Sequence, residues 1–293
     1  MSRVGLSWRA GLWVLLLPYL LGVLVLVGLP AIMSAGLAFT TFDALTPPVF
    51  VGLQNFRFLA SDPLTSVALG NTLLFIVLAV PLRIGGALAL ALLLQGRRRG
   101  AGGYRAAVYV PTVIPDVAYA LIWLWIFNPL FGPVNLVLGA LGVPLPGWLA
   151  DEGTAKYPLV VMSLFQIGEG FVILLAALRG IPRSLYDAGS VDGAGRVASF
   201  RYLTLPMLLP WLVLLTFRDV IVAFQYTFTP SLVMTGGGPY YATFFLPYQL
   251  YEEAFDRFRF GTGSALMLVT FLLSGALIAG LYLIFRGRGA LDD

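Results

Sequence analysis

Of the 293 residues, 59% are apolar and only 11% are charged, and the mean hydropathy is +0.90, which excludes a water-soluble domain with a polar surface. The net charge of +4 does not indicate nucleic-acid binding, because the basic residues lie in short segments between apolar stretches. The absence of histidine and cysteine excludes a Ser-His catalytic triad, a His-based zinc site and disulfide bonds.

Six apolar stretches are each long enough to cross a bilayer, which takes roughly 20 residues in a helix. The first follows Arg3 and Arg9, and its apolar run is too long for a signal peptide, so we expect a retained anchor helix. The expected spans are residues 11–34, 67–94, 106–127, 157–178, 206–228 and 264–285. The sequence therefore predicts an all-α integral membrane protein with six transmembrane helices. Residues 1–66 would form the anchor and first outer loop, 67–285 a five-helix core, and 286–293 a short tail.

The basic residues are unevenly distributed between the two sides of the predicted bundle. One side has the two ends of the chain and the second and fourth loops, with Arg3, Arg9, Arg97, Arg98, Arg99, Arg105, Arg179, Arg183, Arg196, Arg201, Arg286 and Arg288. The other side has Arg57, Lys156, Arg257 and Arg259. Because cytoplasmic loops carry an excess of Lys and Arg, we expect both termini to be cytoplasmic.

Five ionisable residues fall inside the expected spans, where each costs about 2.5–3.5 kcal/mol to insert. They are Arg83, Asp116, Glu169, Arg218 and Asp219. Counted by depth, Arg83 can meet Asp116, and Glu169 can meet Arg218. The remaining acid would be protonated, solvated or in contact with substrate. These pairs can serve helix packing alone, but Glu169 stands beside Gln166, Gly168 and Gly170, as hydrogen bonding to a polyhydroxylated ligand would require.

The fourth loop, about residues 181–206, is too polar and too rich in small residues to be another span. Leu185, Ala188, Gly189 and Asp192 recur at spacings of three and four, which predicts one short amphipathic helix. The glycines at 193 and 195 would end it in a turn, and Pro206 would open span five. Small residues on a helix face let another protein approach closely, although an ordinary connector fits the spacing as well.

This loop resembles the EAA loop of inner-membrane subunits of ABC importers. Asp187-Ala188-Gly189 stand at the E-A-A positions, Gly193 at the following glycine, and Leu203-Thr204-Leu205-Pro206 at the I-x-L-P. Asp for Glu, Gly for the second Ala and Leu for Ile are the departures. Further segments resemble the carbohydrate branch of these permeases, related to maltose and glycerol-phosphate importers: VGLQNFRFLASDPL, NTLLF, PTVIPDVAYALIWLWIFNPLFGPVNLVLGALG, LVMTGGGP, YEEAF and GTGSAL.

The resemblance implies a type I ABC importer permease of the bacterial or archaeal cytoplasmic membrane, without catalytic activity or cofactor of its own. The implied partners are a second homologous permease, an ATPase dimer and an extracytoplasmic sugar-binding protein. No P-loop motif surrounds Lys156, so ATP would be bound by the partner ATPase. The residues implied in coupling to that ATPase are Asp187, Ala188, Gly189, Asp192, Gly193 and Ala194. The candidates for sugar contact are Gln166, Glu169, Gln225 and Tyr226, with helix packing as the alternative.

Two other classes of protein fit less well. A secondary transporter could use Asp116, Glu169 and Asp219 to bind protons or sodium, but no inverted repeat is evident between the halves of the chain. A membrane enzyme is disfavoured by the lack of histidine, cysteine and a clustered acidic motif.

Overall fold

The structure is a computed structural model that describes residues 8–96 and 100–286. Five of the basic residues used above for orientation, Arg3, Arg97, Arg98, Arg99 and Arg288, lie outside these ranges. The chain divides into two compact units. The first unit comprises Met1–Ser61 with Leu250–Val269, and the second comprises Asp62–Gln249 with Thr270–Asp293.

The first unit begins with one continuous helical run made of α1 (Trp8–Val23), the π-helical segment η1 (Leu24–Gly28) and α2 (Leu29–Leu37). The wider turn of η1 lies directly before Pro30, whose missing N–H group cannot join a regular helical ladder. The apolar part of this run, Leu12–Leu37, is long enough to cross a membrane and has no buried residue in its most apolar window. It corresponds to the expected anchor helix.

A two-stranded hairpin and a short helix follow in the first unit. Strands β1 (Thr40–Thr41) and β2 (Val49–Phe50) pair antiparallel, and α3 (Gln54–Ser61) comes next. The side chain of Asn55 donates to the carbonyl oxygens of Ala38 at 2.9 Å and Thr40 at 2.8 Å, which joins α3 to the end of the first helical run. In the hairpin loop, hydrogen bonds from Thr46 and from the backbone of Leu45 hold the pKa of Asp43 below its usual value.

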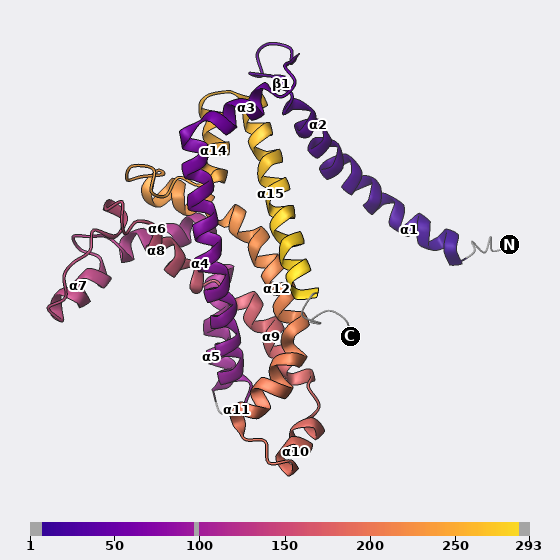
Figure 1. Cartoon of the computed structure of the whole chain (residues 1–293), viewed down its shortest axis with the longest axis vertical. Coiled ribbons are helices and arrows are strands. Elements are labelled where there is room, and N and C mark those ends of the chain that lie inside the picture. The colour runs from indigo at the N-terminus through magenta and orange to yellow at the C-terminus, as the bar shows by residue number, and fades with distance from the viewer. Residues whose placement is uncertain (1–7, 97–99, 287–293) are drawn as a thin grey trace, which may run out of the picture. The chain divides into compact units, whose positions relative to one another are not determined.

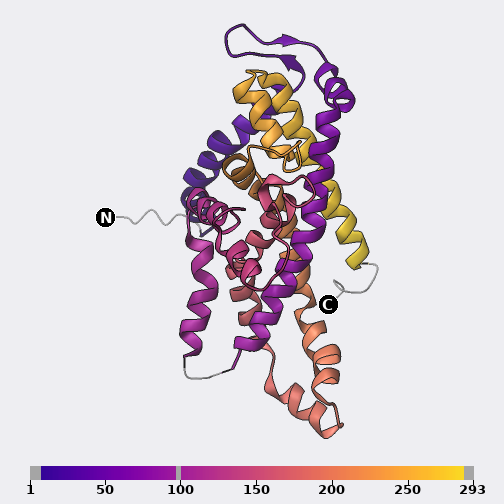
Figure 2. The same ribbon diagram turned by 90° about the vertical axis from the view of Figure 1, so that its left-hand side faces the viewer.

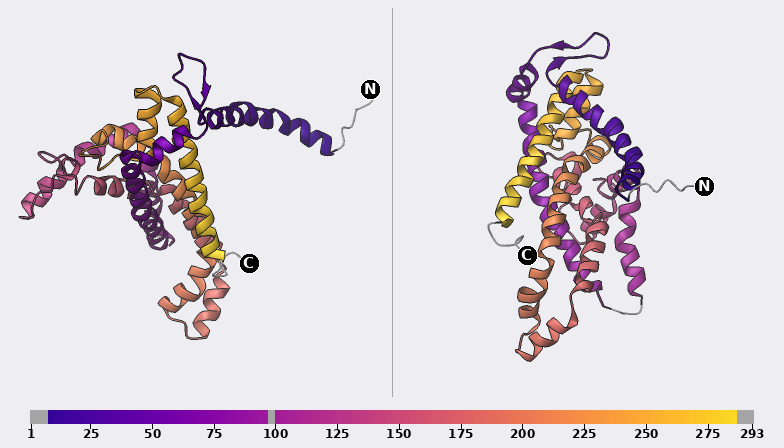
Figure 3. Two further views of the ribbon diagram at one scale, coloured as in Figure 1. Left: turned by 45° about the horizontal axis from the view of Figure 1, so that its top comes forward. Right: turned by 90° about the vertical axis from the view of Figure 1, so that its right-hand side faces the viewer.

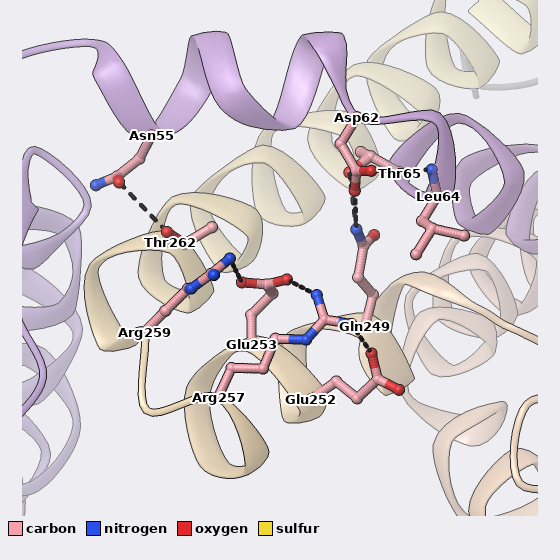
Figure 4. A network of polar contacts seen from close by, with 10 residues as sticks. All are labelled: Asn55, Asp62, Leu64, Thr65, Gln249, Glu252, Glu253, Arg257, Arg259 and Thr262. Carbon is pink, nitrogen blue, oxygen red and sulfur yellow. Dashed lines mark hydrogen bonds and ion pairs between the residues drawn. The ribbon is translucent and has the colours of Figure 1, made fainter.

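The carboxyl-terminal part of the first unit contains a buried charge cluster. It is formed by η6 (Glu252–Asp256) and the loop leading to α15 (Phe260–Arg286). Glu253 is fully buried and contacts Arg257, while Arg259 Nη1 lies 3.7 Å from its second carboxylate oxygen (Figure 4). Burial raises the pKa of Glu252, and the charge of Arg257, 2.9 Å away, partly offsets that rise. The buried carboxylate is therefore compensated by two cations.

The second unit contains the remaining helices (Figures 1 and 2). They are α4 (Pro63–Leu94), α5 (Ala101–Tyr109), η2 (Val110–Val113), α6 (Asp116–Ile126), α7 (Pro133–Ala140), η3 (Trp148–Ala150), α8 (Lys156–Leu164), α9 (Gly168–Gly180), α10 (Arg183–Val191), α11 (Arg196–Ser199), η4 (Phe200–Thr204), α12 (Leu205–Tyr226), α13 (Phe228–Pro230) and η5 (Ser231–Thr235). Helices α14 (Leu246–Tyr251) and α15 have residues in both units.

Helix α4 packs against α8, α9 and α12 and is the central helix of the second unit. It begins at Pro63, and the side chain of Asp62 caps it by accepting from the backbone N–H of Leu64 at 3.2 Å. The same carboxylate accepts from the amide of Gln249 at 3.2 Å (Figure 4). Further along, α4 presents small residues to α9 and α12, which lets three long helices pack closely. The core cluster there includes Ala87, Ala91, Phe171, Leu174, Leu208 and Leu215.

The membrane spans agree with expectation in place but not always in shape. Within the described residues, five helices are long and apolar enough to cross a membrane, and the bent pair Ala101–Val113 and Asp116–Ile126 makes a sixth if the two helices are counted as one broken span. This third span was expected to be one straight helix, but it turns by 103° next to Pro115, whose ring removes a backbone donor. Helix α12 starts at Leu205, so Pro206 lies in its first turn, as expected. The candidate span that contains it is longer than expected, Arg196–Thr235, because the π-helical η4 lies directly ahead of α12.

Candidate functional site

Three helices of the second unit bring their charged side chains together. Arg83 Nε on α4 lies 3.0 Å from Asp219 Oδ2 on α12, and each side chain is only 7% exposed. The neighbouring Arg218 donates to Asp219 Oδ1 at 2.7 Å and also contacts Glu169 on α9. Asp219 thus accepts from two guanidinium groups at once, which compensates the cost of burying the charges of Arg83 and Asp219.

The expected pair of Arg83 with Asp116 is wrong, since Arg83 meets Asp219. The depth count assumed that the third span runs straight through the membrane. The bend at Pro115 instead makes Asp116 the first residue of α6 and leaves it exposed. A carboxylate at a helix N-terminus is stabilised there by the helix dipole. Glu169 and Arg218 do contact each other, as their depths suggested.

Of the four candidate sugar contacts, three lie next to this ion-pair network and one does not. The Tyr226 ring lies 5.8 Å from the Arg83 guanidinium carbon and stacks on Phe75 at 6.0 Å. Its hydroxyl is buried and has no hydrogen-bond partner among the described residues. Gln166 takes part through its backbone oxygen, 3.4 Å from Arg83 Nη2. The structure therefore gathers Gln166, Glu169 and Tyr226, whereas Gln225 is exposed on α12. Sequence reasoning missed Phe75, because a phenylalanine in an apolar span carries no distinguishing signal.

The break between α8 and α9 positions Gln166 and Glu169. Gly168 opens α9, and its N–H donates to the Thr112 hydroxyl at 3.2 Å. A Cβ at this position would lie 2.9 Å from the Tyr109 Cα, so only glycine allows the two backbones to approach this closely. The chain consequently turns at mid-span and exposes the Gln166 carbonyl to Arg83.

A second feature is the short helix α10, which ends in a Schellman motif. The N–H of Ala194 bonds to the Gly189 carbonyl at 2.8 Å, and the N–H of Gly193 bonds to the Ser190 carbonyl at 3.2 Å. Gly193 has φ of +80°, a conformation that glycine adopts without strain. The prediction of a short helix ended by a glycine turn is thus confirmed.

Helix α10 lies beyond the ends of α9 and α12 (Figures 2 and 3) and buries none of its own residues. Asp187, Ala188, Asp192 and Gly193 are exposed, while Gly189 and Ala194 are partly covered. The nearby apolar side chains Val191 and Val197 are 87% and 80% exposed. A helix that presents small and apolar residues to solvent in this way has a surface suited to contact with another protein.

Two contacts attach α10 to the start of span five. The Tyr186 hydroxyl lies 2.9 Å from the Thr204 hydroxyl. A Cβ at Gly189 would lie 3.1 Å from Leu203 Cδ1, which is tighter than ordinary packing. Glycine at 189 therefore leaves room for the Leu203 side chain at this contact.

Comparison with known proteins identifies the class of membrane protein that carries this arrangement. The family model described as the binding-protein-dependent transport system inner membrane component matches residues 83–288, which include the ion-pair network and α10. The chain belongs to this family. The resemblance found in the sequence is confirmed, and the expected location in an inner membrane agrees with the description of the family.

Relatives and solved structures agree with this membership. The probable ABC transporter permease protein YesP of Bacillus subtilis is 34% identical over 88% of this chain and 84% of its own length. The sn-glycerol-3-phosphate transport system permease protein UgpA of Pectobacterium atrosepticum is 34% identical over 76% of each chain. The crystal structure of a bacterial alginate ABC transporter, in complex with its alginate pentasaccharide-bound periplasmic protein, has a chain that matches with a TM-score of 0.82. The match covers 94% of both chains at 20% identity, and it confirms the type I importer permease fold.

Proposed function

We propose that this permease forms the translocation path of an ATP-driven sugar importer together with a second permease. The observation that carries the proposal is the exposed helix α10, attached to span five, in a chain that has no P-loop of its own. Membership in a binding-protein-dependent family supports the partner that delivers the substrate. The names of UgpA and of the alginate transporter support a polyhydroxylated substrate.

In the proposed mechanism, α10 docks into a partner ATPase on the cytoplasmic side. The docking residues are Asp187, Ala188, Gly189, Asp192, Gly193 and Ala194. Movement of the ATPase would carry α10, and the Tyr186–Thr204 contact would transmit it to the continuous helix Arg196–Thr235. That helix holds Arg218 and Asp219, so rigid-body motion reaches the mid-membrane network.

A second permease subunit would cover surfaces that this chain leaves open. The span Leu12–Leu37 buries none of its most apolar window within the described structure, which gives it an apolar surface for lipid or another subunit. Its extended contact surface is consistent with a dimeric permease. The orientation with both termini in the cytoplasm follows from the distribution of basic residues.

The substrate would pass the network formed by Arg83, Arg218, Glu169 and Asp219. The side chain of Glu169 is 47% exposed, so its carboxylate is accessible to a ligand although it contacts Arg218. The buried Tyr226 hydroxyl, without a partner among the described residues, is a further candidate donor. Gln166 and Gln225 would add amide groups at neighbouring levels.

Reconstitution of the full complex tests this proposal. The chain is co-expressed with the second permease and the ATPase from its own operon or genome, purified and placed in proteoliposomes with the binding protein. We expect a sugar-loaded binding protein to stimulate ATP hydrolysis and to drive sugar uptake, and the chain alone to do neither. Uphill uptake by the purified chain alone, driven by a proton or sodium gradient, would contradict the proposal and support an ion-coupled transporter.

A further inference from the structure

A large polar cavity lies at the α10 end of the second unit, away from the ion-pair network. Its volume is about 800 Å³, which is within the usual range for a ligand pocket. The ends of α4, α5, α9 and α10 surround it, together with η4. Its polar lining consists of Gln95, Arg105, Arg179, Arg183, Tyr186 and Thr204. Among the residues that the structure describes, three cations and no carboxylate line the cavity, so it is suited to an anion.

The three arginines differ in their hydrogen bonds and in their exposure. Arg105 donates from Nε and Nη2 to the carbonyl of Leu94, at 3.1 and 2.6 Å, and so satisfies the end of α4. Arg179 and Arg183 are exposed, and neither forms an ion pair with a carboxylate within the described part of the chain. Arg183 is also the first residue of α10, whose first turn has no side-chain cap, so the positive end of the helix dipole lies at a residue that lines the cavity.

An apolar groove on the side of the helix bundle adjoins this polar cavity. Its volume is about 440 Å³, and it lies between α9 and α12. Ile173, Ala176, Ala177, Gly180, Met207 and Trp211 line it. Ile181 lines both the groove and the polar cavity, so the two meet at this residue. Trp211 is 44% exposed, as suits an indole near the edge of a bilayer.

We propose that the cavity and groove together bind one anionic phospholipid of the cytoplasmic leaflet. The phosphate diester lies between Arg179 and Arg183, and an acyl chain lies in the groove along α9 and α12. Basic pockets at the ends of transmembrane helices fit such head groups, because the arginines supply charge and directed donors in one place. The inference uses the cytoplasmic placement of α10 from the proposed function, but it concerns lipid binding and does not require transport.

Binding of phosphatidylglycerol to the full chain tests the proposal. The chain is placed in nanodiscs of phosphatidylcholine with or without phosphatidylglycerol, and the lipids retained after release are counted by native mass spectrometry. Each arginine should contribute about fivefold to affinity, so the double variant Arg179→Gln, Arg183→Gln should bind phosphatidylglycerol about 25-fold more weakly. Filling the groove with Ala177→Phe should also weaken binding.

The matched control is Arg196→Gln, Arg201→Gln, which removes two charges from the same loop at positions that line neither the cavity nor the groove. Its affinity for phosphatidylglycerol should stay unchanged. An equal loss in the control, or equal retention of both lipids by the unaltered chain, would overturn the proposal. So would displacement of phosphatidylglycerol by inorganic phosphate, because the cavity would then recognise a soluble anion. Failure of transport in the reconstituted complex leaves these binding results unaffected.

Discussion

Replacing Gly193 with aspartate should abolish sugar uptake while leaving the permease in the membrane. An L-residue at φ of +80° is strained by at most about 1–2 kcal/mol, and by less for aspartate and asparagine, which is too little to unfold the protein. The strain and the added charge beside Asp192 both fall on the proposed docking surface. In the reconstituted complex, we expect ATP hydrolysis to continue without uptake, measured by phosphate release and by sugar accumulation in the same vesicles.

Gly193→Asn is the matched control, because asparagine tolerates the left-handed conformation better than most residues and adds no charge. It should retain most of the uptake. Normal uptake by Gly193→Asp would show that the turn after α10 has no part in coupling. Loss of the protein from the membrane would place its role in folding instead.

Asp219→Ala should sharply reduce the amount of folded protein. The substitution leaves Arg83, 7% exposed, without the carboxylate that lies 3.0 Å away. Removing one partner of a buried ion pair costs about 3–5 kcal/mol, a large share of the stability of a single chain. Thermal unfolding of the detergent-solubilised chain and its yield in the membrane measure the effect.

Asp116→Ala serves as the control for this substitution, since Asp116 is exposed at the start of α6. It removes the same carboxylate and should cost less than about 1 kcal/mol. If Asp116→Ala were the more damaging change, Arg83 would be paired as depth alone predicts, and the bend in the third span would be contradicted.

The contrast between Asp116 and Asp219 shows which features of the network could be predicted from the sequence and which could not. Depth along a span can be counted from its ends, so the sequence identified all four members of the network. It could not choose between Asp116 and Asp219, because that choice depends on the direction in which the side chains point. A bend of 103° at Pro115 decides it, and proline in a membrane helix can produce either a kink or an intact span.

Local chemistry was easier to predict than packing. The glycine turn after α10 follows from residue type, since Gly193 and Ala194 supply the two bonds of a Schellman motif. The helical segment η4 ahead of Pro206 was missed, because a π-helical turn is not visible in apolar periodicity. The Tyr186–Thr204 contact was missed for another reason. It joins residues 18 apart across a turn, and only the folded backbone brings them together.

The central claim is that α10 is a cytoplasmic lever moved by an ATPase, and a single introduced cysteine tests it most directly. The chain contains no cysteine, so Ala188→Cys provides one reactive thiol on the exposed face of α10. In inverted membrane vesicles that contain the whole complex, we expect this thiol to cross-link to the ATPase, with a yield that changes on addition of ATP. A membrane-impermeant maleimide added to intact cells should leave it unlabelled. Labelling from outside the cell, or the absence of any cross-link to the ATPase, would contradict the claim.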